Sequence, residues 1–424
     1  MKRTAWILTL IIAAVLLSAC GATPTATPTP TLTPTAAPTP ASDGSAGAET
    51  PACQVAVLFQ EQPEAAKLLP PISDQDWKLG PDGAYLTLIE YSDFQCPYCQ
   101  QTSQGIKDFV AAHAGEVQLV YRHFPLPGHD KSTLSTQAAE AAGLQGKFWE
   151  MHALLFDAAN WTAWIEMSLE DFSSWVIGQA ETIEGLDVEK FKTDLTSDAI
   201  VKKATDAYAT ATELQIPGTP SLYVLIDGKL YFTPLDQVSA DSATLELVYE
   251  LSKFKDRQFD ACPPTVIDAN KHYTATLETS KGKIVIELFP DKAPLAVNSF
   301  VFLAREGWFD NAPWHRVLKG FVAQSGDPSG TGVFGPGYLF KNESSDLKFD
   351  QAGLVGMANS GADRNGSQFF ITLDATPNLD GGYTIFGRVI EGMDVVQSLT
   401  VRDPQSGGVL PEPDTILSVT IEEK

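Results

Sequence analysis

The chain has 424 residues, 44% of them hydrophobic, and a formal net charge of −24 at pH 7. This length is too great for one ordinary domain, and the hydrophobic content suffices for two domains that each bury a core. The negative charge argues against nucleic acid and against anionic lipid headgroups as partners, because both would repel the chain.

The N-terminus has the pattern of an export signal. A basic start at residues 1–3 precedes a mostly apolar run over residues 5–17, which is too short for a transmembrane helix of about 20 residues. The run ends in the sequence LSACG, which resembles the lipobox of bacterial lipoproteins and makes Cys20 the lipidated residue. The alternative is an ordinary signal peptide that is cleaved near Ala19. We expect residues 1–20 to be a lipoprotein signal peptide, and the protein to be extracytoplasmic and lipid-anchored to the bacterial cell membrane.

Residues 21–52 are almost entirely Thr, Pro, Ala, Ser and Gly. A segment of this composition has no side chains that could build a hydrophobic core, so we predict a disordered linker. A Pro-rich chain extends by up to about 3.1 Å per residue, so a linker of about thirty residues would reach roughly 90 Å from the membrane.

The five cysteines suit an oxidising compartment. Cys20 is assigned to lipid, and Cys96 and Cys99 form a C-x-x-C pair. Cys53 and Cys262 remain, and they are candidates for a structural disulfide that would close a loop of roughly 200 residues. The competing interpretation is two free thiols, which in an exported protein would be prone to oxidation.

The Cys96 and Cys99 pair lies between a strand-like run at 85–91 and a helical pattern at 100–112. A thiolate on Cys96 would face the amide groups at the start of that helix, which lowers its pKa, and Cys99 would be the buried resolving thiol. The same spacing supplies half of a zinc site, but no second cysteine pair and no histidine cluster completes one. The pattern therefore favours redox chemistry, with no metal and no cofactor.

The sequence EYSDFQCPYC at residues 90–99 resembles the active-site segment of DsbA-like thioredoxin-fold oxidoreductases. The resemblance implies an α/β thioredoxin-like domain with a helical insertion over residues 53–263. The elements expected after the first helix are a strand at 117–124, the insertion at 134–214, a strand at 221–227 and a closing helix at 242–255.

Further positions of this domain take roles that the resemblance implies. Thr219 and Pro220 match a loop in which the proline is cis and faces the dithiol; a plain Pro-rich turn is the alternative. Glu90 matches a buried carboxylate beneath the dithiol that accepts the proton of the resolving thiol; a solvent-exposed carboxylate on an edge strand is the alternative. Tyr98 stands where strongly oxidising members of the family carry His, which leaves the direction of electron flow open.

A second pattern begins near residue 273, with alternating strands at 273–279 and 283–289 and a helix at 293–305. A resemblance to cyclophilin-type prolyl isomerases spans residues 272–424 and is carried by the segments 314–324, 353–359 and 365–372. The resemblance implies an all-β closed antiparallel barrel capped by helices, which follows an inter-domain linker at 264–271.

Carried across position by position, this resemblance also assigns a site. Arg316 matches the catalytic arginine, which would donate to the prolyl nitrogen as the peptide bond twists. The positions that match the proline pocket and the peptide-binding wall are Phe321, Val322, Phe370, Leu379, Gln324, Ala358, Asn359 and Gln368. At the pocket rim, Tyr383 stands where many members have His, and Asn378 where many have Trp. The alternative is a barrel that binds proline peptides without catalysis.

The string G-x-G-x-x-G occurs at residues 330–335 and matches a dinucleotide-binding motif in letters only. Pro336 follows directly, so no helix can begin there to bind a phosphate. We predict a surface loop beside the peptide groove.

Together these patterns predict a lipid-anchored folding factor that combines thiol–disulfide exchange with prolyl isomerisation. The expected partners are exported client proteins with Cys and X-Pro bonds, the membrane through the lipid anchor, and an unidentified membrane redox partner, with no nucleic acid. The alternative is a proline-peptide-binding chaperone or scaffold in which one or both catalytic sites are inert.

Overall fold

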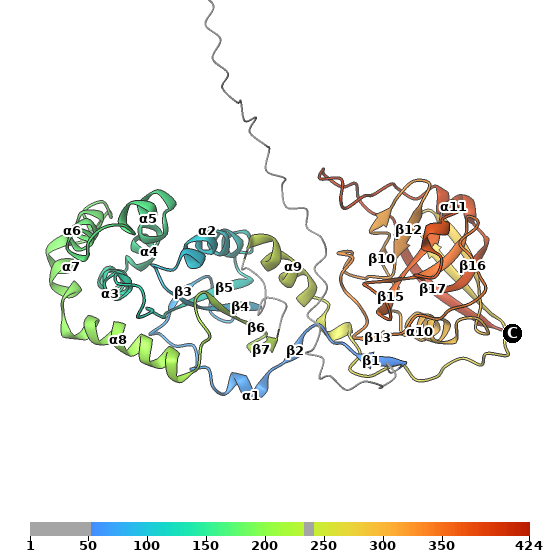
Figure 1. Ribbon diagram of the computed structural model, residues 1–424, viewed down its shortest axis with the longest axis horizontal. Helices are drawn as coiled ribbons and strands as arrows, with labels where there is room; N and C mark the ends of the chain where they lie inside the picture. The colour runs from blue at the N-terminus through green and yellow to red at the C-terminus, as the bar shows by residue number, and fades with distance from the viewer. Residues whose placement is uncertain (1–51, 233–240) are drawn as a thin grey trace, which may run out of the picture. The chain divides into compact units, whose positions relative to one another are not determined.

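The computed structural model of the protein describes residues 52–232 and 241–424 (Figure 1). The predicted signal peptide, the lipidation site Cys20 and nearly all of the linker at 21–52 lie outside the described residues. Within the described ranges, no helix combines the length and the apolar character that crossing a membrane requires.

The first sheet has six strands in the order β2-β7-β6-β4-β5-β3. They are β2 (Gln60–Glu61), β3 (Trp77–Leu79), β4 (Leu86–Ser92), β5 (Val117–His123), β6 (Ser221–Ile226) and β7 (Lys229–Phe232). Strand β4 is buried along its whole length, and it pairs in parallel with β5 and antiparallel with β6. Continuous burial is typical of a central strand that is covered on both faces. This part therefore has the α/β architecture of a thioredoxin-like domain.

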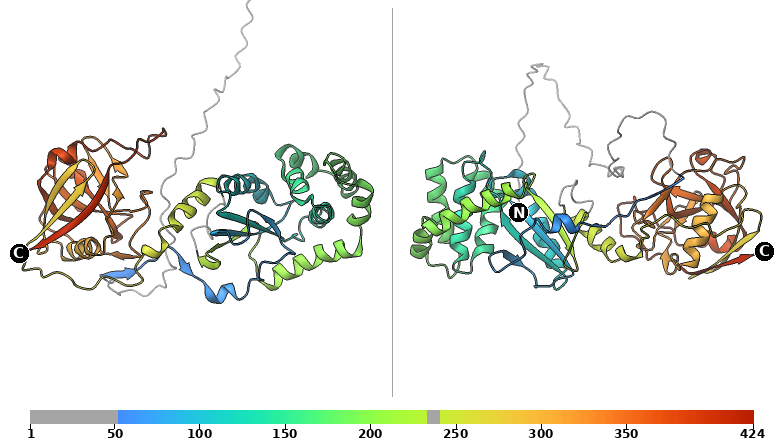
Figure 2. Two further views of the ribbon diagram at one scale, coloured as in Figure 1. Left: turned by 180° about the vertical axis from the view of Figure 1, so that it is seen from behind. Right: turned by 90° about the horizontal axis from the view of Figure 1, so that it is seen from below.

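The helices of this part are α1 (Pro63–Ala66), α2 (Pro97–Ala112), α3 (Ser132–Gly143), α4 (Phe148–Phe156), α5 (Ala158–Trp164), α6 (Leu169–Ala180), α7 (Val188–Leu195), α8 (Asp198–Glu213), α9 (Ser242–Ser252) and the 3-10 turn η2 (Lys255–Arg257). Helices α3 to α7 gather at one end of the first sheet (Figures 1 and 2). Ser168, Asp187 and Ser197 cap α6, α7 and α8 by accepting hydrogen bonds from amides of the first turn. Trp164 and Phe172 are fully buried in the core of this insertion.

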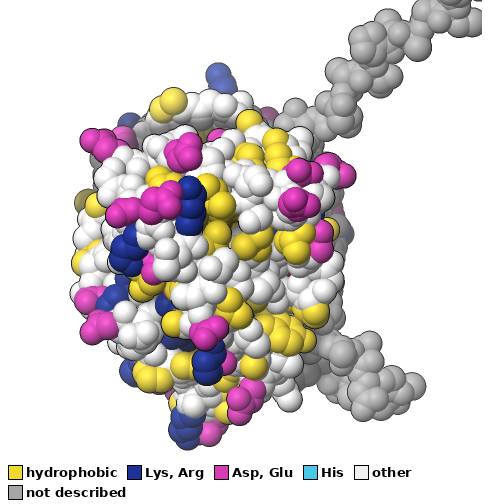
Figure 3. Space-filling model, turned by 90° about the vertical axis from the view of Figure 1, so that its left-hand side faces the viewer, with side chains coloured by type: hydrophobic (Ala, Val, Ile, Leu, Met, Phe, Trp, Pro, Cys, Tyr) yellow, Lys and Arg dark blue, Asp and Glu magenta, His cyan; other side chains and the backbone are white. Residues whose placement is uncertain are grey.

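The outer surface of the insertion carries charges of both signs. Ion pairs at helical spacing on α7 and α8 join Lys190 to Asp194, Lys192 to Glu189 and Lys202 to Asp206. Figure 3 shows acidic and basic side chains interspersed with hydrophobic ones on this face. Exposed pairs of this kind each contribute little stability, so we interpret this face as solvated surface.

The second sheet has eleven strands, which all pair antiparallel. They are β1 (Cys53–Val55), β8 (Tyr273–Thr279), β9 (Gly282–Leu288), β10 (Ala312–Pro313), β11 (Arg316–Val317), β12 (Val322–Ser325), β13 (Tyr338–Phe340), β14 (Leu354–Asn359), β15 (Asn365–Thr372), β16 (Ile385–Glu391) and β17 (Thr415–Glu423). Its helices are α10 (Pro294–Arg305), α11 (Met393–Gln397) and the 3-10 turn η3 (Pro377–Leu379). Figure 1 shows α10 and α11 at opposite ends of the sheet.

The expectation of a closed barrel is wrong, because this sheet curls without closing. Its main path runs β1-β13-β15-β14-β16-β9-β8-β17-β10, with β12 pairing β15 and β11 pairing β12 at the side. No pairing among the described strands joins β10 to β11. Only Trp314 and His315 separate β10 from β11 along the chain, so β10 pairs with β17 and β11 pairs with β12. The amide of Trp314 donates to Asp414 of the loop before β17.

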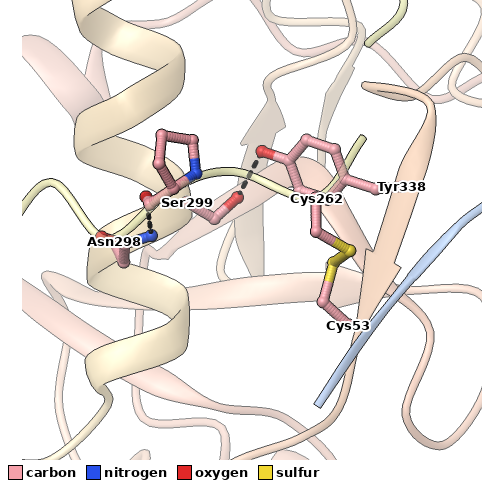
Figure 4. Close-up of a disulfide and its surroundings, with 6 residues drawn as sticks. Cys53, Cys262, Asn298, Ser299 and Tyr338 are labelled. Carbon is pink, nitrogen blue, oxygen red and sulfur yellow. Dashed lines mark hydrogen bonds between the residues drawn. A yellow bond between two sulfur atoms is a disulfide. The ribbon is translucent and has the colours of Figure 1, made fainter. Parts of the chain in front are cut away.

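The two ends of the first part are both attached to the second sheet. Cys53 and Cys262, which the sequence analysis paired, form a disulfide, and β1 pairs with β13 in the register Cys53 to Phe340. Both cysteines were assigned to the first domain, but Cys53 lies in a strand of the second sheet. Figure 4 shows the disulfide beside α10.

The expected inter-domain linker at 264–271 also has fixed contacts. The side chain of Asn298 on α10 donates to the carbonyl of Pro264 (2.9 Å) (Figure 4). It also accepts from the amide of Val266 (2.7 Å). Arg305 donates to the carbonyl of Val266 (3.0 Å). The first part of this segment, residues 264–266, is therefore bound to α10.

Candidate active sites

The dithiol lies where β4 ends and α2 begins. The amide of Cys96 donates to the carbonyl of Asp93 (3.0 Å), which closes the turn, and Pro97 takes the first helical position. Cys99 is fully buried and Cys96 nearly so, whereas the Tyr98 ring between them is 67% exposed. Neither thiol is in a disulfide in this structure.

Cys96 is surrounded by groups that favour its thiolate. The thiol of Cys99 acts first to lower the pKa of Cys96 to about 6, and the side chain of Thr219 and the amides of Tyr98 and Cys99 act in the same direction against burial. The protonated Cys96 donates to the carbonyl of Thr219 (3.2 Å), and the Thr219–Pro220 peptide bond is cis. Burial raises the pKa of Cys99 far above the usual range for a thiol. The arrangement makes Cys96 the nucleophile, and it keeps Cys99 protonated until Cys99 attacks a mixed disulfide on Cys96.

Glu90 lies beneath the dithiol on β4 and is 1% exposed, so it is not an edge-strand carboxylate in solvent. Burial raises its pKa to about 7, against a smaller opposing effect of Ser92 and Lys107. Its Oε1 atom has no hydrogen-bond partner among the described residues. A carboxyl with this pKa exchanges its proton near neutral pH, as a proton carrier for the thiols requires.

One buried carboxylate of this site was not predicted from the sequence. Asp93 accepts hydrogen bonds from the amides of Gln95 (2.8 Å) and Leu126 (2.9 Å), from the hydroxyl of Ser132, and from His129 at 2.7 Å. Three of these four partners follow β5 and lie more than 30 residues from Asp93. Local sequence patterns carry no signal for such contacts.

In the second part, strand register brings three predicted residues into one row. Arg316 on β11 lies opposite Gln324 on β12, which lies opposite Phe370 on β15. Residues in register on neighbouring strands share a face of the sheet. Arg316 donates to Gln324 (3.4 Å), and its guanidinium lies 5.8 Å from the Phe321 ring centroid.

Gln368 extends this polar row and links it to the loop that contains the G-x-G-x-x-G string. It accepts from Gln324 (3.0 Å) and donates to the carbonyls of Gly332 (3.0 Å) and Phe334 (3.3 Å). The loop is in turn held by buried Asp327, which accepts from the amides of Gly332 (2.7 Å) and Phe334 (3.2 Å). Asp327 is thus a supporting residue that the motif search missed.

An apolar cluster beside this row corresponds to the predicted proline pocket. Its buried members are Val322, Phe349, Leu354, Phe370, Leu379 and Ile385, with Phe321, Ala358 and Tyr383 packed against them. The Tyr383 ring stands edge-on to Phe370, with centroids 5.6 Å apart. Asn359 of the predicted wall donates to the carbonyl of Gly382 (3.1 Å). All nine residues predicted for peptide binding therefore lie in this row, in this cluster or at its edge.

Across the described ranges 52–232 and 241–424, no group of three or more His, Cys, Asp or Glu side chains is arranged to hold a metal ion.

Comparison with known proteins identifies both parts. A family model described as cyclophilin type peptidyl-prolyl cis-trans isomerase matches residues 274–421, and a model described as thioredoxin matches residues 73–243. The peptidyl-prolyl cis-trans isomerase cypE of Dictyostelium discoideum is 48% identical over 143 residues, which are 33% of this chain and 92% of that protein. The human peptidyl-prolyl cis-trans isomerase-like 1 is 47% identical over 134 residues, 31% of this chain and 81% of that protein. The chain therefore belongs to the cyclophilin-type peptidyl-prolyl cis-trans isomerases, and it carries a thioredoxin-like domain before the cyclophilin domain.

A solved cyclophilin type peptidyl-prolyl cis-trans isomerase of Cryptosporidium parvum is 32% identical, with a TM-score of 0.33, and covers 36% of this chain and 98% of its own. The two relatives named above are eukaryotic, so export and lipid anchoring in a bacterium stay predictions for this chain.

Proposed function

We propose that this protein is an extracytoplasmic folding factor, tethered by lipid on Cys20, which catalyses prolyl isomerisation and thiol–disulfide exchange on exported proteins. The observation that carries the first activity is the row of Arg316, Gln324 and Phe370 beside an apolar cluster. The observation that carries the second is the pair of thiols with opposite pKa shifts at the start of α2.

Isomerisation needs no covalent step, because the barrier of about 18 to 20 kcal/mol arises from amide resonance. The apolar cluster holds the proline ring, and Gln324 and Gln368 offer amide groups to the flanking backbone. Arg316 donates to the prolyl nitrogen as it becomes pyramidal and loses conjugation with the carbonyl. The donor is needed only in the twisted state, so it accelerates rotation instead of merely tightening binding.

Thiol exchange proceeds through one mixed disulfide. The Cys96 thiolate attacks a client disulfide, one client sulfur leaves as a thiolate, and a Cys96–client disulfide forms. Cys99 then loses its proton, with Glu90 as the acceptor, and attacks Cys96, which releases the second client thiolate and leaves Cys96 and Cys99 joined. Run in reverse, the same steps oxidise a client dithiol, and the redox partner sets the direction.

The isomerase proposal is tested by Arg316→Ala in an assay of a proline-containing test peptide. We expect kcat/KM to fall by about a hundredfold or more, the usual effect of removing one preorganised donor. Arg388→Ala is the matched control, because Arg388 is an exposed arginine of β16 that pairs with Glu287. A wild-type protein that binds the peptide without accelerating its isomerisation would instead support the scaffold alternative.

The thiol proposal is tested by trapping. Cys99→Ser removes the resolving thiol, so we expect mixed disulfides between Cys96 and client proteins to accumulate, visible as adducts on a non-reducing gel. Cys96→Ser should give none, since Cys99 is fully buried. If Cys99→Ser gives no more adducts than Cys96→Ser, the thioredoxin-like domain is not an exchange catalyst.

A further inference from the structure

A histidine from a distant segment stands beside the dithiol turn. His129 lies in the loop between β5 and α3, and its Nδ1 is 2.7 Å from the Asp93 carboxylate. Asp93 is three residues before Cys96, and its carbonyl accepts the amide of Cys96 (3.0 Å). The imidazole is therefore tied to the same turn that presents the nucleophile.

The loop that carries His129 is fastened to this turn at more than one point. The side chain of Gln95 accepts from the amide of Lys131 (2.6 Å) and donates to the carboxylate of Asp130 (2.8 Å). The amide of Leu126 donates to Asp93 (2.9 Å), so contacts flank His129 on both sides. This bracing fixes where the imidazole stands relative to Cys96.

The charges around His129 favour its protonated form. The hydrogen bond to Asp93 raises the pKa of His129, partial burial opposes it, and the negative charges of Asp93, Cys96 and Asp130 act further in the upward direction. Lys131 pairs with Asp130, which offsets part of the charge of that carboxylate. The interaction between His129 and Cys96 is mutual: if a thiolate favours the imidazolium, the imidazolium favours the thiolate.

Tyr98 cannot supply this charge, because its ring is neutral and is 67% exposed. We propose that His129, positioned by Asp93, provides the cation that stabilises the Cys96 thiolate, in place of a histidine between the two cysteines. This inference rests on the thiol-exchange function proposed above. It makes Asp93 a positioning residue, whose carboxylate is held at the turn by the four hydrogen bonds that it accepts.

The protonation state of His129 should set how the rate of Cys96 alkylation depends on pH. While His129 is protonated, the thiolate is favoured, so alkylation of Cys96 stays fast at low pH. As pH rises through the pKa of His129, the imidazole loses its positive charge and no longer favours the thiolate, so the alkylation rate rises less steeply with pH. The wild-type profile of alkylation rate against pH should therefore contain a step at the pKa of His129, beside the step that Glu90 contributes through its pKa of about 7.

The test is His129→Asn, which keeps an N–H donor for Asp93 and removes the charge. In the reduced full-length protein we expect the rate of Cys96 alkylation by iodoacetamide at pH 6 to fall by about three- to tenfold, since one pKa unit is a factor of ten. The step that His129 contributes should disappear from the pH profile, while the step from Glu90, with its pKa of about 7, remains. The equilibrium with glutathione should shift toward the Cys96–Cys99 disulfide by a similar factor, because the reduced form loses its stabilisation.

His113→Asn is the matched control. His113 is also paired with a carboxylate, Glu246 at 2.8 Å, but it lies at the opposite end of α2 from Cys96. Its replacement should leave the alkylation rate and the glutathione equilibrium unchanged.

Two results would overturn the inference: a folded His129→Asn protein with wild-type rates, or a wild-type profile that has no step at the pKa of His129. The second result comes from the wild-type protein alone, so a folding defect in the variant cannot affect it. If the wild type alkylates as predicted but exchanges no disulfide with glutathione, the proposed function fails and the assignment of His129 stands.

Discussion

At the scale of single residues, the positions of Cys96 and Cys99 relative to α2 give two chemically identical thiols different roles. Cys96 stands before the first helical turn, where unpaired amides and the Cys99 thiol lower its pKa. Cys99 is one turn inside the helix, where burial raises its pKa. The spacing in the sequence predicted this division, because the helix start is a local feature. The links from Asp93 to His129 and Ser132 were not predictable, since they join segments that only the folded sheet brings together.

Glu90 should make the stability of the first part depend on pH. Its folded-state pKa is raised from 4.5 to about 7, so the folded protein holds this proton more tightly than the unfolded chain does. The free energy of unfolding should therefore fall by about 3 kcal/mol as pH rises from about 4.5 to about 7, and this group should add no slope outside that window. The measurement is the free energy of unfolding in urea, for the wild type and for Glu90→Gln, across this pH range. Groups that titrate in both proteins affect both free energies alike, so the difference between the two proteins reports on Glu90.

Glu64→Gln is the control for this experiment, because Glu64 is an exposed carboxyl that pairs with Lys67 on the surface. We expect it to leave the pH slope unchanged. Equal slopes in the wild type and in Glu90→Gln would mean that Glu90 titrates normally and does not serve as the proton acceptor of the dithiol.

At the scale of elements, the peptide groove depends on how strands β14, β12 and β15 lie together. The family resemblance predicted which side chains form the groove, and the strand register explains why they meet. It did not predict Gly356 on β14, which lies opposite Phe370 in register. A Cβ atom there would stand 2.6 Å from the Phe370 ring and 2.9 Å from the Phe349 ring. The proline pocket therefore requires glycine at position 356, because a larger residue would displace the two phenylalanine rings.

Gly356→Ala should push the Phe370 ring into the space that the substrate proline needs. We expect a loss of stability of about 1 to 3 kcal/mol, as for other overpacked cores, together with a clear loss of isomerase activity. The measurements are thermal unfolding and kcat/KM on the test peptide. Gly335→Ala is the control, because a Cβ atom there meets nothing within 4 Å. Full activity in Gly356→Ala would show that the pocket can rearrange around an added methyl group.

At the scale of the whole chain, the segments on either side of the thioredoxin-like domain both make hydrogen bonds with the cyclophilin domain. The chain enters through β1, and the amide of Ala56 donates to Gly337 (2.7 Å). It returns through Gln258, which donates to Gly335 (2.9 Å), and Phe259, whose amide donates to Pro336 (2.9 Å). The pairing of β1 with β13 was not predicted from the sequence, because a three-residue strand such as β1 is too short to give a pattern.

The Cys53–Cys262 disulfide should hold the two segments that flank the thioredoxin-like domain together. It spans 209 residues of sequence, and a bridge over a loop of that size is worth up to about 5 kcal/mol in the chain-entropy model. Three residues of pairing cannot persist alone against the entropy of fixing them. In the double variant Cys53→Ser and Cys262→Ser we therefore expect β1 to leave β13, and the second sheet to lose about 2 to 5 kcal/mol of stability.

Hydrogen exchange read segment by segment is the suitable measurement, since a chain with two domains need not unfold in one step. Residues 53–56 and 337–340 should lose protection in the double variant, while α2 keeps it. Replacing Cys96 and Cys99 together is the control, because those thiols lie at the other site and should leave the second sheet unaffected. If β13 stays protected without the disulfide, then the hydrogen bonds of Gln258 and Phe259 are enough to hold the flanking segments at the second sheet. The bridge then serves chiefly to remove two reactive thiols from an oxidising compartment.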